Sequence, residues 1–356
     1  MAEKVLVPVE KLRGHCQGVL TKVGLRQTHA ALVTDSLVFA DLRGVGSHGV
    51  VRLSSYLDRV HAGVMAVDPE MPLVRDNPAS ALLDACNGFG QIAGAKAMDV
   101  AVQKAGDSGA GIVAVKNSNH FGVAAFYAMR AVAARMIGVV LTNASPAMTP
   151  YNAKQRLLGT NPLAVAIPAG LQRPIVLDMS TSVVARGKIR LAAARPGEKI
   201  PFGWAVNADG KPTDNPLEAL KGSLTPIGGP KVAGLSLAID LLCGALTGTA
   251  LTGEVKNITD TSGRSRTGHM FIAINVAKFI DPHTFSHSID SVIQGIKALP
   301  STDGMPVYLP GEIEFNLEGK RREEGIPLAV EVIETLSRLG ERHGVGRLSA
   351  EGMEAG

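Results

Sequence analysis

The chain has 356 residues, which is long enough for two or three packed units with a sizeable buried core. Its 46% hydrophobic and 19% charged residues are typical of a compact folded protein and exclude a disordered or fibrous one. The net charge of +4 comes from 36 basic and 32 acidic residues spread along the sequence. Because nucleic-acid surfaces need clustered positive charge, we expect no nucleic-acid partner.

The cysteines and histidines show no metal or disulfide pattern. Cys16, Cys86 and Cys243 are odd in number and far apart, which fits neither a disulfide framework nor a CxxC site. The histidines lack metal-ligand spacing, so we expect no metal. The first residues lack the continuous apolar stretch of a signal peptide. We therefore predict a cytoplasmic protein.

Residues 232–253 have about the length of a membrane span, but they do not have its composition. Asp240 stands at the centre, and Gly234, Gly244 and Gly248 interrupt the segment. We predict a buried helix here and no membrane association.

The predicted elements start with helices and continue with an alternating pattern. One helix is expected over 28–43 and a second from Ser47 to Gly63. From Ser80, short β-branched runs alternate with alanine-rich helical runs, which favours an α/β fold with a mixed central sheet. Residues 198–215 are expected to form a long loop. We expect strands at 81–83, 111–115, 137–141, 163–167, 174–177 and 270–274, and helices at 93–105, 123–136, 232–246, 289–298 and 327–343.

Three segments follow from this pattern. Residues 1–78 form an N-terminal helical segment, 79–285 the mixed-sheet core for cofactor and substrate, and 286–356 a C-terminal helical segment that packs back on the N-terminal part.

Residues 88–93 match the pattern G-x-G-x-x-A between a predicted strand and a predicted helix. A dinucleotide-binding Rossmann fold also needs an acidic residue after the next strand, and that strand ends in Lys116 and Asn117. We interpret the glycines as a tight turn that lets the helix pack closely on the strand. A Rossmann dehydrogenase that uses this turn is an alternative.

The most informative cluster spans residues 44–56. With Ser47 as N-cap and His48 at the first helical position, a polar face of the helix would carry His48, Arg52, Ser55, Tyr56 and Arg59. An ordinary solvated face is the alternative. A histidine one turn from an arginine suits 2-oxo or 2-hydroxy acids, because the guanidinium binds the carboxylate and the imidazole exchanges the proton at C2.

Other polar stretches are predicted to line the same pocket. His120, Phe121 and Gly122 lie at a predicted helix N-terminus, which suits an anionic cofactor or substrate, although a structural histidine is the alternative. Simple turns are the alternative for each of the remaining stretches. These are residues 159–162, residues 176–182 with the following Arg186 and Lys188, and residues 228–231.

Taken together, these stretches resemble the malate/L-lactate dehydrogenase family that is unrelated to the Rossmann-fold lactate and malate dehydrogenases. The matching pieces run in order over nearly the whole chain. They are residues 41–44, 47–49 with Arg52, 88–91, 118–122, 159–162, 177–182, 229–231 with 234–235, 268–269 and 309–312. Two positions depart from the pattern: Pro230-Lys231-Val232 replaces an aromatic residue followed by Lys-Gly, and Gly46 replaces a larger residue.

The resemblance implies a non-Rossmann, NAD(P)-binding α/β core, an NAD- or NADP-dependent activity on a small carboxylate, and a homodimer. It implies that His48, held by Ser47, is the acid and base, and that His120 shares this role or lies against the cofactor. Arg52 would clamp the substrate carboxylate and Thr160 would touch the substrate. From their places on the polar face and in the pocket rim, we predict Tyr56, Arg186 and Lys188 as further substrate residues. The implied cofactor residues are His120, Phe121, Gly122, Asp178, Met179, Ser180, Thr181, Ser182, Lys231, Pro310, Gly311 and Glu312.

We therefore expect an oxidoreductase that transfers a hydride between nicotinamide and C2 of a small 2-hydroxy or 2-oxo acid, such as malate or lactate. One alternative is a reductase of a cyclic imine carboxylate, either pyrroline- or piperideine-2-carboxylate. Another is a binding protein that keeps the pocket but performs no redox step.

Overall fold

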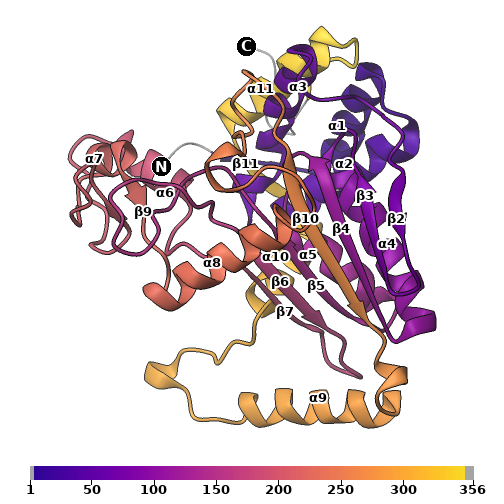
Figure 1. The fold of residues 1–356 in the computed structure, drawn as a ribbon. Coiled ribbons are helices and arrows are strands. Elements are labelled where there is room, and N and C mark those ends of the chain that lie inside the picture. Colours follow the sequence, from indigo (N-terminus) through magenta and orange to yellow (C-terminus); the bar gives the residue numbers. More distant parts are fainter. Residues whose placement is uncertain (1–3, 349–356) are drawn as a thin grey trace.

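The computed structural model describes residues 4–348, which fold around a seven-stranded mixed sheet (Figure 1). Only β3 and β4 run parallel, and every other neighbouring pair of this sheet is antiparallel. This confirms the predicted α/β class and differs from the parallel sheet of a Rossmann fold. The strand order is β2 (Leu73–Asp76), β3 (Ser80–Asp84), β4 (Ala110–Ser118), β10 (Thr267–Ile274), β5 (Ile137–Thr142), β6 (Leu163–Ile167) and β7 (Ile175–Met179).

Helices cover both faces of the sheet. α4 (Gly90–Ser108) and α5 (Ala124–Ala133) pack on one face with α2 (Gln27–Leu42) outside them, and α8 (Pro230–Cys243) packs against the other (Figure 1). The start of α4 confirms the packing interpretation of the G-x-G-x-x-A turn. A side chain at Gly90 would overlap the backbone carbonyl of Asn119, and one at Gly94 would overlap the ring of Tyr127.

The two ends of the described chain meet. β1 (Lys4–Val7) pairs antiparallel with β11 (Ile326–Ala329), and α11 (Val330–Arg342) contacts α1 (Val9–Val23) and α3 (Leu53–His61). The expected helix over 327–343 is therefore a short strand followed by a helix, because residues 327–329 form a ladder with β1. One hydrophobic cluster runs from Val7 through the sheet to Leu336, so the N-terminal helices and the sheet share a core.

Two C-terminal helices precede β11. α10 (Glu312–Glu324) contacts α2, and α9 (Pro282–Lys297) extends below the sheet in the view of Figure 1.

Residues 183–225 form a small lobe, here called the cap, which projects to the left in Figure 1. It contains α6 (Arg186–Ala193), β8 (Ala205–Val206), α7 (Pro216–Lys221) and β9 (Ser223–Leu224). The expected loop over 198–215 therefore holds one short strand. The cap has a hydrophobic cluster of its own, made of Val184, Ile189, Ala192, Ile200, Ala205, Ala219 and Leu224.

α8 is not the fully buried helix that we predicted. Its inner side, including Ser236, Ile239 and Asp240, is buried, whereas four leucines on its outer side are 39–47% exposed. Because nearly every residue of this helix is apolar, the sequence contains no polar stripe that would distinguish the two sides. Among residues 4–348, no helix combines the length and the apolarity needed to cross a membrane.

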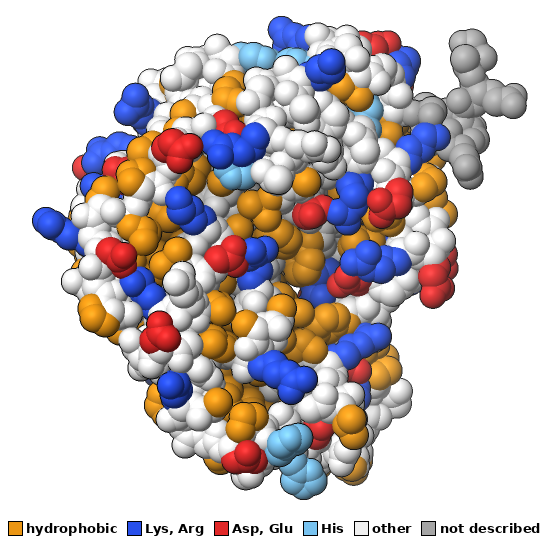
Figure 2. Space-filling model, turned by 90° about the vertical axis from the view of Figure 1, so that its right-hand side faces the viewer, with side chains coloured by type: hydrophobic (Ala, Val, Ile, Leu, Met, Phe, Trp, Pro, Cys, Tyr) orange, Lys and Arg blue, Asp and Glu red, His pale blue; other side chains and the backbone are white. Residues whose placement is uncertain are grey.

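Charged side chains of both signs are mixed on the face of the molecule beside α2 and α4. Figure 2 shows basic and acidic groups next to one another there, with hydrophobic side chains between them. This face presents no extended surface of positive charge.

Candidate active site

The loop between α2 and α3 carries Ser47, His48 and Arg52. Two short 3₁₀ turns, Gly46–His48 and Val50–Arg52, precede α3, so the predicted helix from Ser47 begins too early. Gly49 between the turns has ψ −151°, which interrupts the helical path. The hydroxyl of Ser47 does not cap a helix and lies 2.9 Å from Nδ1 of His48.

Asp41, which is 3% exposed at the end of α2, holds this loop in place. Its carboxylate accepts a hydrogen bond of 2.7 Å from the backbone N–H of Val50, and Arg321 donates to its backbone carbonyl. Burial raises the pKa of Asp41 to about 7, although the Val50 N–H and the charge of Arg321 act in the opposite direction. A side chain at Gly49 would collide with this carboxylate. The loop geometry therefore depends on both residues.

The rings of His48 and His120 stack with their centroids 5.4 Å apart and an interplanar angle of 21°. His120 follows β4, more than seventy residues later in the chain, so the fold brings the two predicted histidines together. Desolvation by the surrounding protein, and then the charge of Arg52, lower the pKa of His48 to about 4. Desolvation also lowers the pKa of His120 well below its usual value. Both imidazoles are neutral at pH 7.

Tyr56 is buried in contact with His120. It is 1% exposed, and its hydroxyl lies 2.8 Å from Nδ1 of His120. We predicted Tyr56 and Arg59 on a polar face of α3, and this is wrong because both side chains point into the protein. The guanidinium of Arg59 donates to the backbone carbonyls of Asn257, Asp260 and Gly263, and this ties α3 to a distant loop.

Arg52 lies beside His48 and is half-buried. Its Nε donates to the carbonyl of Ser47 at 2.7 Å, and within residues 4–348 its guanidinium has no carboxylate partner. Burial lowers the pKa of Arg52, and the charge of Arg190 lowers it further. Arg190 was absent from the predicted site. The sequence signal that could have indicated Arg190 is its position one helical turn after Arg186.

The other predicted substrate residues, Thr160, Arg186 and Lys188, lie in three different environments. The backbone carbonyl of Thr160 accepts hydrogen bonds of 2.9 Å from both the N–H and the hydroxyl of Thr181. Arg186 is half-buried and donates to the carbonyl of Leu220 at 2.7 Å. Lys188 is exposed on the side of α6 opposite Arg186 and Arg190, because two residues turn a helix by about 200°. Its predicted contact with the substrate stays a prediction.

Residues 176–182 contact the other segments predicted to bind the cofactor. The N–H of Val176 donates to the carbonyl of Pro310 at 3.0 Å, and Gly311 packs against Val176 with φ 88°. The carbonyl of Thr181 accepts from the N–H of Ile227 at 3.0 Å, just before α8. Ser180 and Ser182 bond to each other through their hydroxyls, and Glu312 pairs with Lys297.

Asp178 occupies the N-terminus of α5, where we predicted space for an anion. Its carboxylate accepts a 2.8 Å hydrogen bond from the N–H of Ala125. Desolvation raises the pKa of Asp178 to about 6, although the Ala125 N–H and the charge of Arg43 counteract this. The protein itself therefore supplies the negative group at this helix end.

Phe121 is a core residue and not a surface contact. It is 2% exposed and stacks on the ring of His269 at 4.5 Å. His269 is fully buried, with its ring nitrogens next to the hydroxyls of Thr142 and Ser118 at 2.6 and 2.8 Å. Burial lowers the pKa of His269 to about 3.

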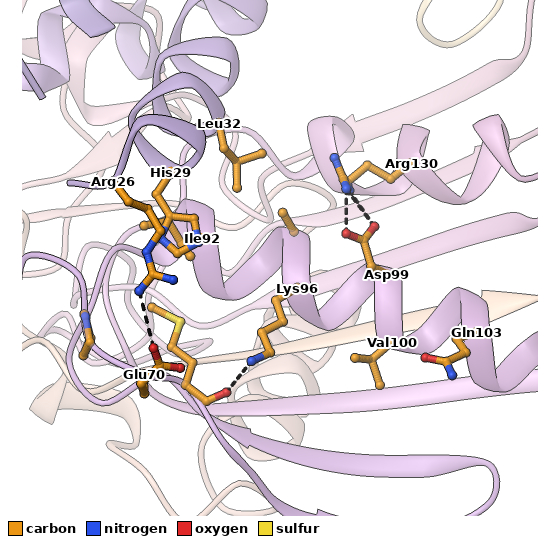
Figure 3. A pocket seen from close by; sticks show the side chains of 13 residues that line it. Arg26, His29, Leu32, Glu70, Ile92, Lys96, Asp99, Val100, Gln103 and Arg130 are labelled. Carbon is orange, nitrogen blue, oxygen red and sulfur yellow. Dashed lines mark hydrogen bonds and ion pairs between the residues drawn. The ribbon is translucent and has the colours of Figure 1, made fainter. Parts of the chain in front are cut away.

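The structure also has a pocket of about 390 Å³ lined by residues of α2, α4 and the segment 69–71 (Figure 3). Its charged groups are engaged with each other or with the backbone: Arg130 with Asp99, Arg26 with Glu70, and Lys96 with the carbonyl of Met71. None of the predicted site residues lines this pocket. No group of three or more potential metal ligands is found among the residues that the structure describes.

Comparisons with known proteins place the chain in a family. The family model described as malate/L-lactate dehydrogenase matches residues 7–337. A malate dehydrogenase from Pyrococcus abyssi is 40% identical over 96% of each chain. A ureidoglycolate dehydrogenase (NAD(+)) from Escherichia coli K12 is 32% identical over 92% of this chain and 93% of its own. The solved sulfolactate dehydrogenase from Methanocaldococcus jannaschii is 38% identical, with a TM-score of 0.91 over 96% of this chain and 98% of its own.

The matching proteins are oxidoreductases of hydroxy acids, and the matches extend over the histidine loop, the central sheet and the cap. The chain belongs to the malate/L-lactate dehydrogenase family.

Proposed function

We propose that this enzyme oxidises a small 2-hydroxy acid reversibly, with His48 exchanging the proton of the C2 oxygen and Arg52 holding the carboxylate. The observation that carries the proposal is the placement of a neutral imidazole beside a guanidinium that has no carboxylate partner within residues 4–348. A bound 2-hydroxy acid supplies the anion that the guanidinium lacks and the hydroxyl that the imidazole can deprotonate.

His48 has one ring nitrogen left to exchange a proton with the substrate. Because Nδ1 is engaged by the hydroxyl of Ser47, Nε2 is the nitrogen left for the substrate. In oxidation, the O–H bond at C2 breaks and its proton moves to Nε2 while the carbonyl forms. In reduction, the protonated imidazole returns this proton to the new hydroxyl oxygen. Ser47 fixes the plane of the ring.

Arg52 fixes the substrate relative to His48. Its Nε is held by the carbonyl of Ser47, which leaves the terminal nitrogens for a carboxylate. Two parallel hydrogen bonds from a guanidinium set both position and orientation, so the face of C2 that is presented for reaction is fixed. Thr160 and Arg186 remain proposed contacts on the far side of the substrate.

The residues around the start of α8 fit a nicotinamide dinucleotide. Gly228 and Gly229 turn the chain with φ 64° and 66°, and the space beside Gly229 is open. Lys231 is exposed and has no carboxylate partner in the described part of the chain. Free N–H groups at a helix start together with a lysine favour a phosphate.

We propose that Lys231 and the first turn of α8 hold the phosphates. Gly122, residues 176–182 and residues 310–312 would line the rest of the cofactor. When bound, the nicotinamide accepts the hydride in oxidation and supplies it in reduction. We assign Tyr56 to positioning His120, since its buried hydroxyl is already engaged there. His120 is then a neighbour of the reacting groups that keeps water away from His48.

The experiment is a screen of small 2-oxo acids with NADH and with NADPH, followed at the nicotinamide absorbance. Oxidation of either cofactor with oxaloacetate, sulfopyruvate or pyruvate supports the proposal and decides between NAD and NADP. Turnover of pyrroline- or piperideine-2-carboxylate alone would identify a cyclic imine reductase. No turnover with any compound, together with tight binding of one of them, would identify a binding protein.

We also propose an oligomeric state and a cellular location for the protein. We propose a homodimer, supported by the exposed leucines on α8, which light scattering of the purified protein tests. We propose a cytoplasmic location, supported by three cysteines that are all free thiols.

A further inference from the structure

His269 is a fully buried histidine of β10 to which the proposed function gives no role. Each of its ring nitrogens has a hydroxyl partner: Nδ1 lies 2.6 Å from Oγ1 of Thr142, and Nε2 lies 2.8 Å from Oγ of Ser118. Its ring stacks on that of Phe121, with parallel planes and centroids 4.5 Å apart. The side chain of His269 therefore contacts residues on both sides of His120 in the sequence.

The directions of these hydrogen bonds follow from their acceptors. The hydroxyl of Thr142 lies 3.1 Å from the carbonyl oxygen of Gly268 and 3.0 Å from that of Asn143, and a carbonyl oxygen only accepts. Since the single proton of this hydroxyl is used there, its oxygen accepts from Nδ1–H of His269. Nε2 then carries the lone pair and accepts from the hydroxyl of Ser118. The imidazole is thus fixed in one tautomer by two different strands.

Ser118 stands at the end of an irregular stretch of β4. In the ladder with β10, Ser118 pairs with Thr267. The next pair is Val115 with His269, so residues 116–117 of β4 face a single residue of β10. A β-bulge of this kind bends a strand and redirects the side chains that follow it. His269 holds the end of β4 just after the bulge, where the chain enters the candidate active site.

The ring of His120 is oriented by contacts at one nitrogen and at one face. Its Nδ1 lies 2.8 Å from the hydroxyl of Tyr56 and accepts from the backbone N–H of Gly122 at 3.3 Å. Its face stacks on the ring of His48. These contacts form only if the backbone that carries His120 is in place, and the two residues that His269 contacts belong to that backbone segment.

We infer that His269 is a positioning residue that sets the place of His120 beside His48. It acts through the hydrogen bond to Ser118 and through the stack on Phe121. This inference rests on the proposed function, in which His120 keeps water away from the reacting imidazole. A shift of the segment would separate two rings whose centroids are 5.4 Å apart. Because a misplacement of 1 Å can cost about 100-fold in rate, even a smaller shift has a measurable effect.

Three substitutions separate the contacts of His269. The side-chain amide of asparagine reaches the position of Nδ1 and can bond to Thr142, whereas that of glutamine reaches the position of Nε2 and can bond to Ser118. His269→Asn therefore removes the contact with the His120 segment, and His269→Gln retains it. Ser118→Ala removes the same hydrogen bond and leaves the imidazole and its stack unchanged.

His15→Asn is the matched control. His15 is also buried, at 7% exposed, and its Nε2 lies 2.9 Å from the carbonyl oxygen of Leu336, between α1 and α11. Asparagine does not reach the position of Nε2 here either, so the control loses a comparable buried contact in another part of the fold.

The kinetic test measures kcat and KM at saturating cofactor, with the number of active sites counted by cofactor fluorescence. Each variant is made in the wild-type background and in His120→Ala. Thermal unfolding shows whether the fold is retained.

We expect His269→Asn and Ser118→Ala to lower kcat by about tenfold, with KM changed less than about threefold. His269→Gln stays within about threefold of the wild type. His15→Asn lowers the unfolding temperature and leaves kcat unchanged. In the His120→Ala background, His269→Asn lowers kcat by less than about twofold further, because the two residues act as one unit.

A second measurement reports the position of His120 without turnover. The nitrogen and proton NMR signals of its ring are assigned by their absence from His120→Ala. We expect them to shift in His269→Asn and in Ser118→Ala, and to stay in place in His15→Asn. If the wild-type enzyme reduces no 2-oxo acid, the proposed function fails, and these signals still decide whether His269 positions His120.

Two results would overturn the inference while leaving the proposed function intact. One is a lower unfolding temperature of His269→Asn with unchanged kcat and unchanged His120 signals, because His269 would then serve only the stability of the fold. The other is an equal loss of kcat in both backgrounds, because His269 would then act through another group. If the His269 variants do not fold, Ser118→Ala decides: a wild-type kcat with unshifted His120 signals overturns the inference.

Discussion

The carboxylate of Asp41 occupies the space that a side chain at residue 49 would need. Asp41 also accepts the N–H of Val50, so the loop with His48 is closed by one buried hydrogen bond and one close approach of the backbone. This relationship joins two parts of the sequence pattern, residues 41–44 and 47–49, that otherwise look independent.

Gly49→Ala should therefore disrupt the site. The added methyl must displace the Asp41 carboxylate or the loop, and overpacking of this kind costs about 1–3 kcal/mol. We expect a lower free energy of unfolding in urea and a loss of kcat. Gly46→Ala is the control in the same loop, because its added methyl would lie 3.5 Å from Oδ1 of Asp41, an ordinary contact. Equal behaviour of the two variants would refute the role of Asp41.

Arg52→Lys should mainly weaken substrate binding. An ammonium keeps the charge but lacks the planar pair of donors, so we expect KM for the acid to rise by about tenfold or more, with a smaller fall in kcat. Steady-state kinetics at saturating cofactor measure both constants. A KM equal to that of the wild type would remove Arg52 from the carboxylate site.

Tyr56→Phe should have a limited effect on catalysis. The ring still fills its buried space, while Nδ1 of His120 loses a partner, which costs about 0.5–1.5 kcal/mol of unfolding free energy. Because proton transfer is assigned to His48, kcat should fall less than about tenfold. Tyr127→Phe removes another buried, hydrogen-bonded hydroxyl and serves as the control. A loss of activity as large as that of a His48 variant would place the Tyr56–His120 pair in the proton transfer.

The pH dependence should differ between the two directions of the reaction. Oxidation requires neutral His48, and its pKa of about 4 means that protonation removes the base only in acid. We expect kcat/KM for oxidation to be flat from about pH 8 to 6 and to fall below that range. Reduction requires the protonated imidazole, so its kcat/KM should rise as the pH falls. If kcat/KM for oxidation fell to half of its maximum near pH 7, another group would be the base.

Much of the sheet could be predicted because its strands are short β-branched runs between turns. β6 and β5 match the expected ranges closely. Two of the errors depend on distant partners: residues 327–329 are a strand because β1 lies beside them, and Arg59 is buried because carbonyls from residues 257–263 bind it. Periodicity in the sequence cannot reveal such contacts.

The site could be predicted only in part, because some of its contacts also join distant segments of the chain. His48 and Arg52 are close in sequence, so their spacing indicated a common role. That His120 shares a pocket with His48 was only a hypothesis, because the two residues belong to different elements, and the stacking of their rings was not predicted. The support from Asp41 and the proximity of Arg190 depend on how α2 and the cap pack, and no local pattern indicates either.

The most direct test is the rate of hydride transfer in a single turnover of His48→Ala, compared with His120→Ala. Both variants are first saturated with reduced cofactor, whose binding is confirmed by fluorescence. If His48 moves the proton, its removal lowers the rate by roughly 10² to 10⁴ with the cofactor still bound, while His120→Ala loses considerably less. A near wild-type rate for His48→Ala would contradict the mechanism.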